Sequence, residues 1–173
     1  MRLYNYFRSS ASFRVRIALA LKGLPYEYVA VHLPKGEHLD ERLSGVLTEN
    51  LVPVLEDGAT KVYQSMAIIE YLDETHPATP LLPKDPAGRA RVRALAQAIA
   101  CEIHPLNNLR VLRYLVRDLK VSDEAKDDWY RHWCRLGLET FERQLNSTAT
   151  GQCCHGDSPT LADCVLEIGR AHV

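Results

Sequence analysis

A proline-rich segment is the feature that most constrains how this chain can fold. Residues 75–88, THPATPLLPKDPAG, carry prolines at positions 77, 80, 83 and 86 and show no periodic apolar pattern. Proline fixes φ and lacks the N–H that helices and sheets need, so such a run interrupts regular structure and indicates a linker. We expect one domain over residues 1–76, a linker over 77–87 and a second domain over 88–173.

The segments before the linker predict an α/β domain. Residues 2–7 and 26–33 have the composition of strands, and the apolar run 15–21 predicts a buried helix that ends at Gly23 and Pro25. Strand, helix and strand in that order favour a parallel pair. Two short strands, at 52–57 and around 61–63, and a helix that begins at Ser65 as its cap complete the pattern.

A long helix is predicted after the linker. Apolar residues between 89 and 116 recur in steps of three or four, which is typical of one face of a helix. Pro105 falls inside it and is expected to kink it where His104, Asn107 and Asn108 cluster. His104, Asn107 and Arg110 are spaced by three, so on a continuous helix they would form one wall of a polar pocket.

Two more helices are expected beyond it. One covers about 123–145, and the other begins in SPTLAD, where Ser158 or Thr160 can cap and Asp163 can complete a capping box. The whole segment after the linker is therefore expected to be helical.

Composition and charge exclude several classes of protein. The 173 residues include 22 acidic and 21 basic side chains, so no net field favours nucleic acid or an anionic membrane. No run approaches the ~20 apolar residues that span a bilayer, and the first residues do not form a signal peptide. The five cysteines show neither a CxxC pair nor zinc-finger spacing. We expect a cytoplasmic protein with reduced thiols and no metal site.

Three short motifs suggest a binding site. Ser9 and Ser10 lie where the first strand meets the first helix, and they either cap that helix or present hydroxyl and N–H groups to a thiolate. No cysteine is nearby in the sequence, so the thiol would belong to a cofactor. Val52-Pro53 is either a cis turn that leaves a backbone free for an extended peptide or an ordinary trans edge proline. Gln64-Ser65 is either a carboxylate site or an N-cap.

These motifs, in this order and ahead of a helical segment, resemble the zeta class of glutathione S-transferases, the group that contains maleylacetoacetate and maleylpyruvate isomerases. The matching stretches are YFRSSASFRVRIALALKGLPYEY, LVPVLEDG, QSMAIIEYLDETHP, LLPKDP, IHPLNNLRVLRYL and GDSPTLADCVL. The resemblance implies a thioredoxin-like N-terminal domain, an incomplete glutathione transferase-type helical domain, a homodimer, and glutathione as cofactor.

The resemblance also assigns the glutathione site. Ser9 would hold the sulfur, with Ser10 and the Ala11 N–H beside it, and the other positions are His38 for the glycyl end, Val52 before Pro53 for the cysteinyl backbone, and Gln64 and Ser65 for the γ-glutamyl end. Two positions depart from the family pattern. Relatives usually have cysteine or threonine where this chain has Ala11, and NPQGLVP where it has LTENLVP.

The second substrate implied by the resemblance is a dianionic maleyl compound. Arg8 and Arg110 would clamp its carboxylates, because guanidinium pairs bidentately with carboxylate, and the remaining substrate-binding positions are His104, Asn107 and Asn108. From the residues alone, both arginines are also consistent with exposed surface charges, and His104 with a structural histidine. The implied chemistry is reversible thiolate addition to the cis double bond, with Ser9, Ser10 and Arg8 as the catalytic residues.

The predicted function is glutathione-dependent cis–trans isomerisation of maleylacetoacetate or maleylpyruvate in the catabolism of aromatic amino acids or aromatic acids. Two alternatives stay open. One is a general glutathione S-transferase or peroxidase, and the other is a non-catalytic binding module with the same fold.

The final residues do not resemble the family. Relatives continue through further helices, whereas this sequence ends in EIGRAHV, and residues 168–173 match the translation of one frame of a common sequencing adapter. The hypothesis is that these six residues derive from the adapter. The genomic locus would test it.

Overall fold

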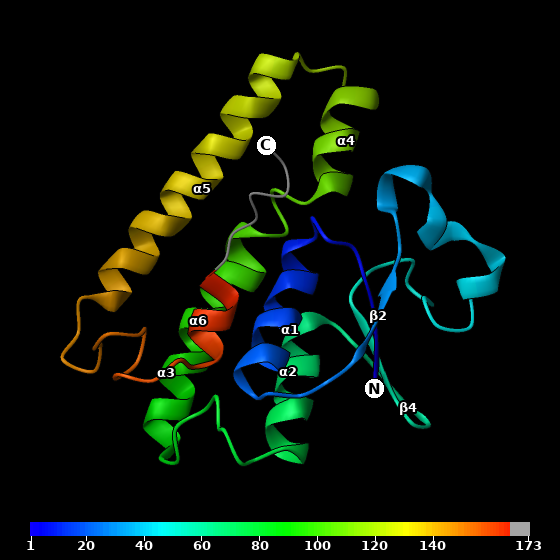
Figure 1. Ribbon diagram of the computed structural model, residues 1–173. Coiled ribbons are helices and arrows are strands. Elements are labelled where there is room, and N and C mark those ends of the chain that lie inside the picture. Colours follow the sequence, from blue (N-terminus) through cyan, green and yellow to red (C-terminus); the bar gives the residue numbers. More distant parts are fainter. Residues whose placement is uncertain (167–173) are drawn as a thin grey trace. The chain divides into compact units, whose positions relative to one another are not determined.

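The computed structural model describes residues 1–166 (Figure 1). The adapter hypothesis concerns residues outside this range. The chain divides into two compact units, residues 1–82 and a second unit that begins at Pro83. Each unit is described by itself below.

The first unit is built on a four-stranded sheet in the order β2-β1-β3-β4. The strands are β1 Arg2–Asn5, β2 Glu27–Ala30, β3 Val54–Asp57 and β4 Thr60–Tyr63. β1 and β2 are parallel, as the strand–helix–strand order predicts, and the β1–β3 and β3–β4 pairs are antiparallel. β1 and β2 are shorter than their sequence patterns indicated, because pairing stops at Asn5 and Ala30.

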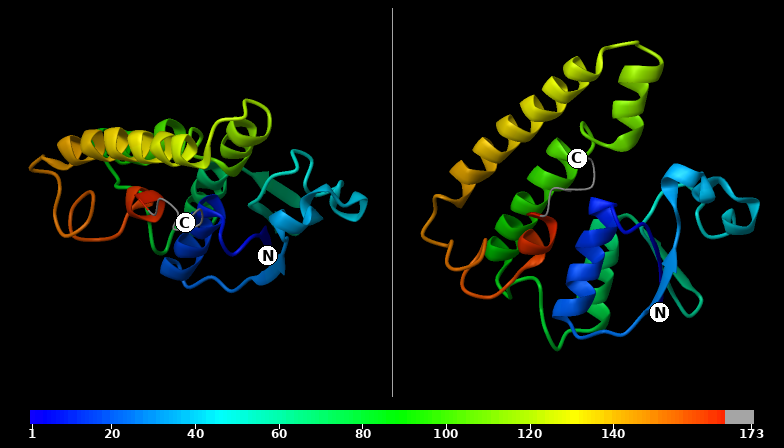
Figure 2. Two further views of the ribbon diagram at one scale, coloured as in Figure 1. Left: turned by 90° about the horizontal axis from the view of Figure 1, so that it is seen from above. Right: turned by 45° about the horizontal axis from the view of Figure 1, so that its top comes forward.

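Two helices cover one face of this sheet, as Figures 1 and 2 show. They are α1, Ser10–Leu21, and α2, Ser65–Thr75, and they contact each other. Their shared core buries apolar side chains from both helices and the sheet, among them Leu3, Val15, Leu19, Leu55, Ile68 and Leu72. α1 ends as expected, because Gly23 at φ 65° adopts the left-handed conformation that closes a helix.

A buried ion pair joins the ends of these two helices. Lys22 follows α1, and its Nζ lies 2.8 Å from Asp73 Oδ1 with 1% of the lysine side chain exposed. The same ammonium donates to the His76 and Thr79 carbonyls at 3.0 and 2.8 Å. Asp73 Oδ1 also accepts the Leu81 N–H at 2.7 Å. One lysine therefore ties α1 to α2 and to the proline-rich segment.

The second unit is helical, as predicted. Its elements are α3 Pro86–Gln97, a π-helical segment η4 Ala98–Ile103, α4 Leu109–Arg117, α5 Asp123–Leu145 and α6 Leu161–Leu166. α5 has the predicted bounds, and its N-cap is Ser122. The π segment and α6 contact α3, and α5 contacts both the π segment and α4.

The prediction of one long helix over 89–116 was wrong. The helix widens into the π segment and stops, and residues 104–108 form a turn before α4 begins. Pro105 is the local cause, since it cannot donate to the preceding turn. The turn is held from outside, because the Trp129 indole donates to the Leu106 carbonyl at 2.9 Å. Proline thus breaks the helix here where a kink was expected.

Asp163 makes the carboxylate half of a capping box at the start of α6, with Thr160 and not Ser158 as its partner. Asp163 Oδ2 accepts the Thr160 N–H at 2.7 Å and the Thr160 hydroxyl at 2.8 Å, and Oδ1 accepts the Cys154 N–H at 2.9 Å. Burial opposes the charged carboxylate, but these hydrogen bonds outweigh it and hold the pKa of Asp163 below its usual value.

Gly137 allows α5 to approach the π segment closely. A Cβ at this position would lie 2.3 Å from Ile103 Cγ1 and 2.4 Å from its Cδ1. Neither separation is possible for carbon atoms in contact, which prefer about 3.5 to 4.0 Å. The glycine is therefore required by packing.

All five cysteines are free thiols. Within residues 1–166, each helix falls short of the length or the apolar character that crossing a membrane requires.

Candidate functional site

The sheet topology brings the predicted glutathione-binding positions to one edge of the first unit. Tyr4 in β1 pairs with Val54 in β3, which pairs with Tyr63 in β4. This row lies at the carboxyl end of β1, the amino end of β3 and the carboxyl end of β4. The residues that follow or precede the row, at 6–11, 52–53 and 64–65, therefore leave the sheet at the same edge.

Ser9 is the N-cap of α1. Its φ and ψ are −76° and 118°, and its Oγ accepts the Ser12 N–H at 3.2 Å. A hydroxyl has one donor and two acceptor positions, so capping uses a lone pair and leaves the O–H available to donate. Capping and thiolate binding, which the sequence left as alternatives, are thus compatible in this geometry.

The residues around Ser9 add donors and charge. Ser10 is the first residue of α1 and is buried, Ala11 is half-buried, and Arg8 is exposed before the cap. Among residues 1–166, no acceptor receives the backbone N–H groups of Ser10 and Ala11. Free N–H groups and the helix dipole make the start of a helix favourable for an anion. A thiolate would be stabilised there.

The Val52-Pro53 peptide bond is cis, which confirms the predicted cis turn and excludes the trans alternative. Val52 precedes β3, and within the described chain its N–H and C=O form no hydrogen bond. An extended peptide can therefore pair with this backbone as an added strand.

Gln64, not Ser65, occupies the cap position of α2. Its side chain makes no capping bond and donates from Nε2 to Glu49 Oε2 at 2.9 Å. Gln64 has φ 66° and ψ 124°, a conformation that costs a non-glycine residue about 1 to 3 kcal/mol. Such strain is often concentrated at ligand sites, and here it turns the chain abruptly from β4 into α2.

Ser65 is the first residue of α2 and is buried, 6% exposed. Its Oγ accepts from Arg14 Nη1 at 3.4 Å, and Arg14 is itself only 2% exposed. A buried guanidinium group therefore lies next to the N-terminus of α2, where the Gln64-Ser65 motif suggested a site for a ligand carboxylate. Arg14 precedes an apolar run in α1, and no local pattern in the sequence reveals a partner 51 residues away.

His38 lies in a series of 3₁₀ turns between β2 and β3. These turns are η1 Leu33–Lys35, η2 Glu37–Leu39 and η3 Glu41–Leu43, and His38 is half-buried in the middle one. Its predicted contact with the glycyl end of glutathione stays a prediction.

In the second unit, the break between the π segment and α4 carries the predicted substrate residues. Asn108 caps α4 by accepting the Arg110 N–H at 3.1 Å, and its Nδ2 lies 3.4 Å from His104 Nε2. Arg110 is exposed in the first turn of α4, and His104 is half-buried at the end of the π segment. His104, Asn107 and Arg110 do not share the continuous helix face that their spacing suggested, because the helix is broken between them.

Asn107 points into the second unit. It is 3% exposed, and its Nδ2 donates to Cys134 Sγ at 3.2 Å and to the Tyr130 carbonyl at 3.4 Å. Burial raises the pKa of the Cys134 thiol above its usual value, although its hydrogen bonds with Tyr130 and Asn107 act in the opposite direction. Asn107 thus links the helix break to α5, a role that its sequence spacing did not indicate.

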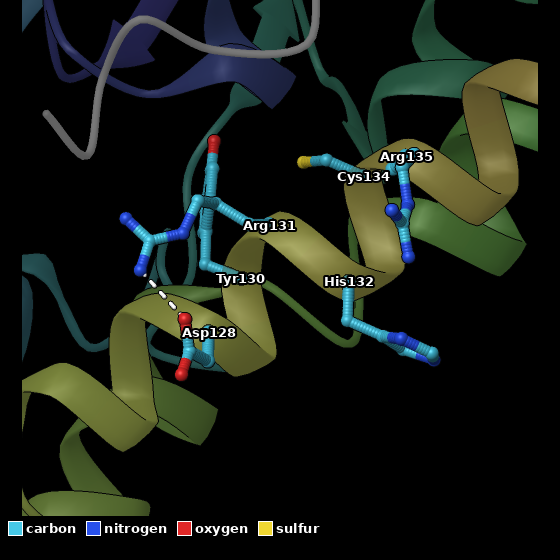
Figure 3. Close-up of a pocket in the computed structure, with 6 residues that line it drawn as sticks. All are labelled: Asp128, Tyr130, Arg131, His132, Cys134 and Arg135. Atoms are coloured by element: carbon cyan, nitrogen blue, oxygen red, sulfur yellow. Dashed lines mark hydrogen bonds and ion pairs between the residues drawn. The ribbon is translucent and has the colours of Figure 1, made fainter.

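α5 also borders a hollow of about 600 Å³, shown in Figure 3. Its lining residues are Asp128, Tyr130, Arg131, His132, Cys134 and Arg135. Asp128 and Arg131 pair with each other at 2.6 Å, and Figure 3 shows His132 turned away from Cys134 and Tyr130. These side chains do not converge on one point, so the hollow lacks the arrangement of a reactive centre.

The first unit has the fold of the N-terminal domain of a glutathione S-transferase. Residues 3–80 match the family described as "Glutathione S-transferase, N-terminal domain". The chain is 48% identical to maleylpyruvate isomerase from Ralstonia sp. over 96% of this chain and 79% of the relative. It is 43% identical to maleylacetoacetate isomerase from Mus musculus over 95% of this chain and 74% of the relative.

Solved structures give the same result. The holo structure of maleyl pyruvate isomerase, described as a bacterial glutathione S-transferase in the zeta class, superposes with a TM-score of 0.92 at 48% identity, covering 95% of this chain and 78% of that one. Maleylacetoacetate isomerase from Methylobacterium extorquens AM1, solved with bound malonate and GSH, has a TM-score of 0.91 at 40% identity and the same coverage. The chain belongs to the zeta-class glutathione S-transferases, the family of the maleylpyruvate and maleylacetoacetate isomerases.

Proposed function

We propose that this protein is a glutathione-dependent cis–trans isomerase of a maleyl-type dicarboxylate, either maleylpyruvate or maleylacetoacetate, in the catabolism of aromatic acids or aromatic amino acids. The observation that carries the proposal is the 48% identity with maleylpyruvate isomerase over 96% of the chain. The serine cap, the cis proline and the strained Gln64 at one sheet edge support it.

The residues of the first unit fit glutathione as cofactor. When bound, glutathione supplies a thiolate nucleophile that adds reversibly to the cis double bond and is released unchanged. The Ser9 O–H is free to donate to a sulfur, and the N–H groups of Ser10 and Ala11 have no other acceptor within the described residues. The free Val52 backbone suits the cysteinyl peptide group.

The carboxylate ends of glutathione have cationic and polar partners. We assign Gln64 and Ser65 to the γ-glutamyl end, where the N-terminus of α2 and the buried Arg14 favour a negative charge. His38 and Pro53 complete the proposed set, which therefore contains Ser9, Ser10, Ala11, His38, Val52, Pro53, Gln64 and Ser65. Ala11 offers only its backbone.

The proposed substrate-binding residues are Arg8 in the first unit and His104, Asn108 and Arg110 in the second. The exposed guanidinium groups of Arg8 and Arg110 can each pair with a carboxylate, and His104 beside Asn108 can polarise a carbonyl oxygen as negative charge develops on it. Asn107 belongs to this set as a positioning residue, since its amide holds the turn that carries Asn108.

We further propose that the protein is a cytoplasmic homodimer with domains at 1–76 and 88–173. α2 ends at Thr75 and α3 begins at Pro86, so most of the proposed linker over 77–87 lies between the two helices. Size-exclusion chromatography with light scattering tests the dimer, and a mass of one chain would contradict it.

Two other functions are separable by stoichiometry. An isomerase converts many equivalents of maleylpyruvate or maleylacetoacetate per glutathione and leaves the thiol concentration constant. A general transferase consumes glutathione with a halogenated aromatic or a peroxide, and a binding module does neither but is retained on immobilised glutathione.

The decisive experiment measures substrate isomerisation and thiol concentration together, for the wild type, Ser9→Ala and Ser158→Ala. Ser158 is an exposed serine with no recorded partner among the described residues and serves as the matched control. We expect turnover that Ser9→Ala reduces by about 10²-fold or more, as for loss of one preorganised donor. Stoichiometric thiol loss, or no turnover of either acid, would contradict the proposal.

A further inference from the structure

Arg16 lies two turns inside α1, yet its guanidinium group reaches back to the loop before the helix. Nη1 donates to Asn5 Oδ1 at 2.9 Å and to the Tyr6 carbonyl at 3.4 Å, and Nη2 donates to the Phe7 carbonyl at 3.0 Å. One side chain therefore binds acceptors on three consecutive residues, from the last residue of β1 into the turn before α1.

The Asn5 side chain and the Arg16 guanidinium group are each held by a second contact. Asn5 is fully buried at the end of β1, and its Nδ2 donates to the Leu3 carbonyl at 3.0 Å, which orients Oδ1 toward the arginine. The guanidinium carbon lies 5.0 Å from the centre of the Phe13 ring, within the range of a cation–π contact. Arg16 is thus held in one orientation by its own helix and by the sheet.

The loop held by Arg16 leads directly to the residues proposed to act on the thiol and the substrate. The Ser9 N–H donates to the Tyr6 carbonyl at 3.0 Å and closes a four-residue turn, so the same carbonyl serves Ser9 and Arg16. Arg8 lies inside that turn with an exposed side chain. A displaced Tyr6 or Phe7 carbonyl would move both the cap and Arg8.

We propose that Arg16 is a positioning residue, which fixes the turn Tyr6–Ser9 and with it the direction of the Ser9 hydroxyl and the Arg8 side chain. The proposal rests on the proposed function, since it assigns Arg16 to the same site. Arg16 acts through backbone carbonyls. Lysine cannot replace it, because one ammonium group lacks the planar fork that reaches several acceptors in fixed directions.

The test compares Arg16→Lys, Arg16→Gln and Phe13→Leu with the wild type. Phe13 is 38% exposed, so its substitution should be tolerated if the Arg16 variants fold poorly. Arg2→Lys is the matched control, because Arg2 is an exposed arginine of the same unit that pairs with Glu27 at 2.9 Å. Each protein is assayed for kcat, for the glutathione KM, for thiolate formation by bound glutathione as pH rises, and for amide exchange in residues 6–9.

We expect Arg16→Lys and Arg16→Gln to lower kcat by about 10- to 100-fold, the effect of a small misplacement of reacting groups. Thiolate formation should require a higher pH, amide exchange in 6–9 should quicken, and the glutathione KM should change little. Phe13→Leu should shift each quantity in the same direction by less, and Arg2→Lys should leave all of them unchanged.

The inference is overturned if Arg16→Lys behaves as the wild type. It is also overturned if kcat and the urea unfolding midpoint of Arg16→Lys both fall while its glutathione KM rises, because that combination indicates a purely structural role. If the wild type isomerises neither acid, the proposed function fails separately. Thiolate formation and amide exchange then decide the role of Arg16: unchanged values in both Arg16 variants refute it.

Discussion

The Lys22–Asp73 pair gives the sharpest stability prediction. The Lys22 ammonium group has three partners at 2.8 to 3.0 Å, and the exposed fractions of the two side chains are 1% for Lys22 and 11% for Asp73. Lys22→Met keeps most of the volume of the side chain and removes only the charge and its donors. Asp73 then remains as a nearly buried carboxylate that keeps its hydrogen bond from the Leu81 N–H.

Removing one partner of a buried ion pair costs about 3 to 5 kcal/mol. This is a large fraction of the 5 to about 15 kcal/mol that stabilises an ordinary domain. We therefore expect the first unit of Lys22→Met to unfold at much lower urea than the wild type. Replacing both partners, in Lys22→Met/Asp73→Leu, should recover part of the loss, because no buried charge is left unpaired.

The assay must report on the first unit. Both tryptophans, Trp129 and Trp133, lie in α5, so their fluorescence follows the second unit. Urea unfolding is therefore best followed by amide exchange in the peptides of α1 and α2. Lys126→Met is the matched control, because Lys126 pairs with Asp123 on the surface of α5 and its loss should change the free energy of unfolding little.

Two results would refute the reasoning. The first is a Lys22→Met protein as stable as Lys126→Met, which would mean that the buried pair contributes nothing. The second is a double variant destabilised by the sum of the two single changes, which would mean that Lys22 and Asp73 do not interact.

Three further predictions concern the second unit and the cap of α1. Gly137→Ala should destabilise the second unit by about 1 to 3 kcal/mol in urea unfolding followed by tryptophan fluorescence, because overpacking against Ile103 outweighs the higher helix propensity of alanine; an equal or higher midpoint would contradict this close approach. Asp163→Asn should cost about 1 to 2 kcal/mol at neutral pH through loss of the capping box. Since the pKa of Asp163 is lower in the folded than in the unfolded protein, the carboxylate contributes its full stability above the unfolded pKa of about 3.9, and this contribution is lost as pH falls through the lower folded value. The difference in free energy of unfolding between the wild type and Asp163→Asn should therefore narrow below about pH 4. A difference that does not change with pH would count against this role of Asp163. Ser9→Ala should lower the stability of the protein by about 1 kcal/mol and should also lower its isomerase activity. Ser9→Asp should restore the cap, as measured by thermal unfolding, without restoring turnover in the isomerase assay. Recovery of activity in Ser9→Asp would indicate that Ser9 acts only by capping α1.

Several local elements were predictable from the sequence because their signals lie within a few residues. The bounds of α5 match the predicted range of about 123–145, and the end of α1 follows from Gly23. Thr160 and Asp163 are three residues apart, which is the spacing of a capping box. The residues of the first unit that resemble the zeta class also lie in short contiguous stretches.

The remainder was decided by contacts between distant segments. The turn at residues 104–108 is held by a hydrogen bond from Trp129, and the buried side chains of Arg14 and Lys22 have partners 51 residues away at Ser65 and Asp73. Periodicity read over a short window cannot include such partners. For that reason Pro105 indicated a kink where the chain has a break.

The sequence by itself determined the type of each domain, the order of the strands and helices in the first unit, and the short motifs of the proposed glutathione site. Only the tertiary structure decided how that site is held: Ser9 caps with a free O–H, Gln64 takes a strained conformation, and Arg16 reaches back to the turn before the helix. The physical reason is that a local pattern encodes backbone periodicity and turn chemistry, whereas the direction of a functional group depends on hydrogen bonds whose donors and acceptors meet only in the folded chain.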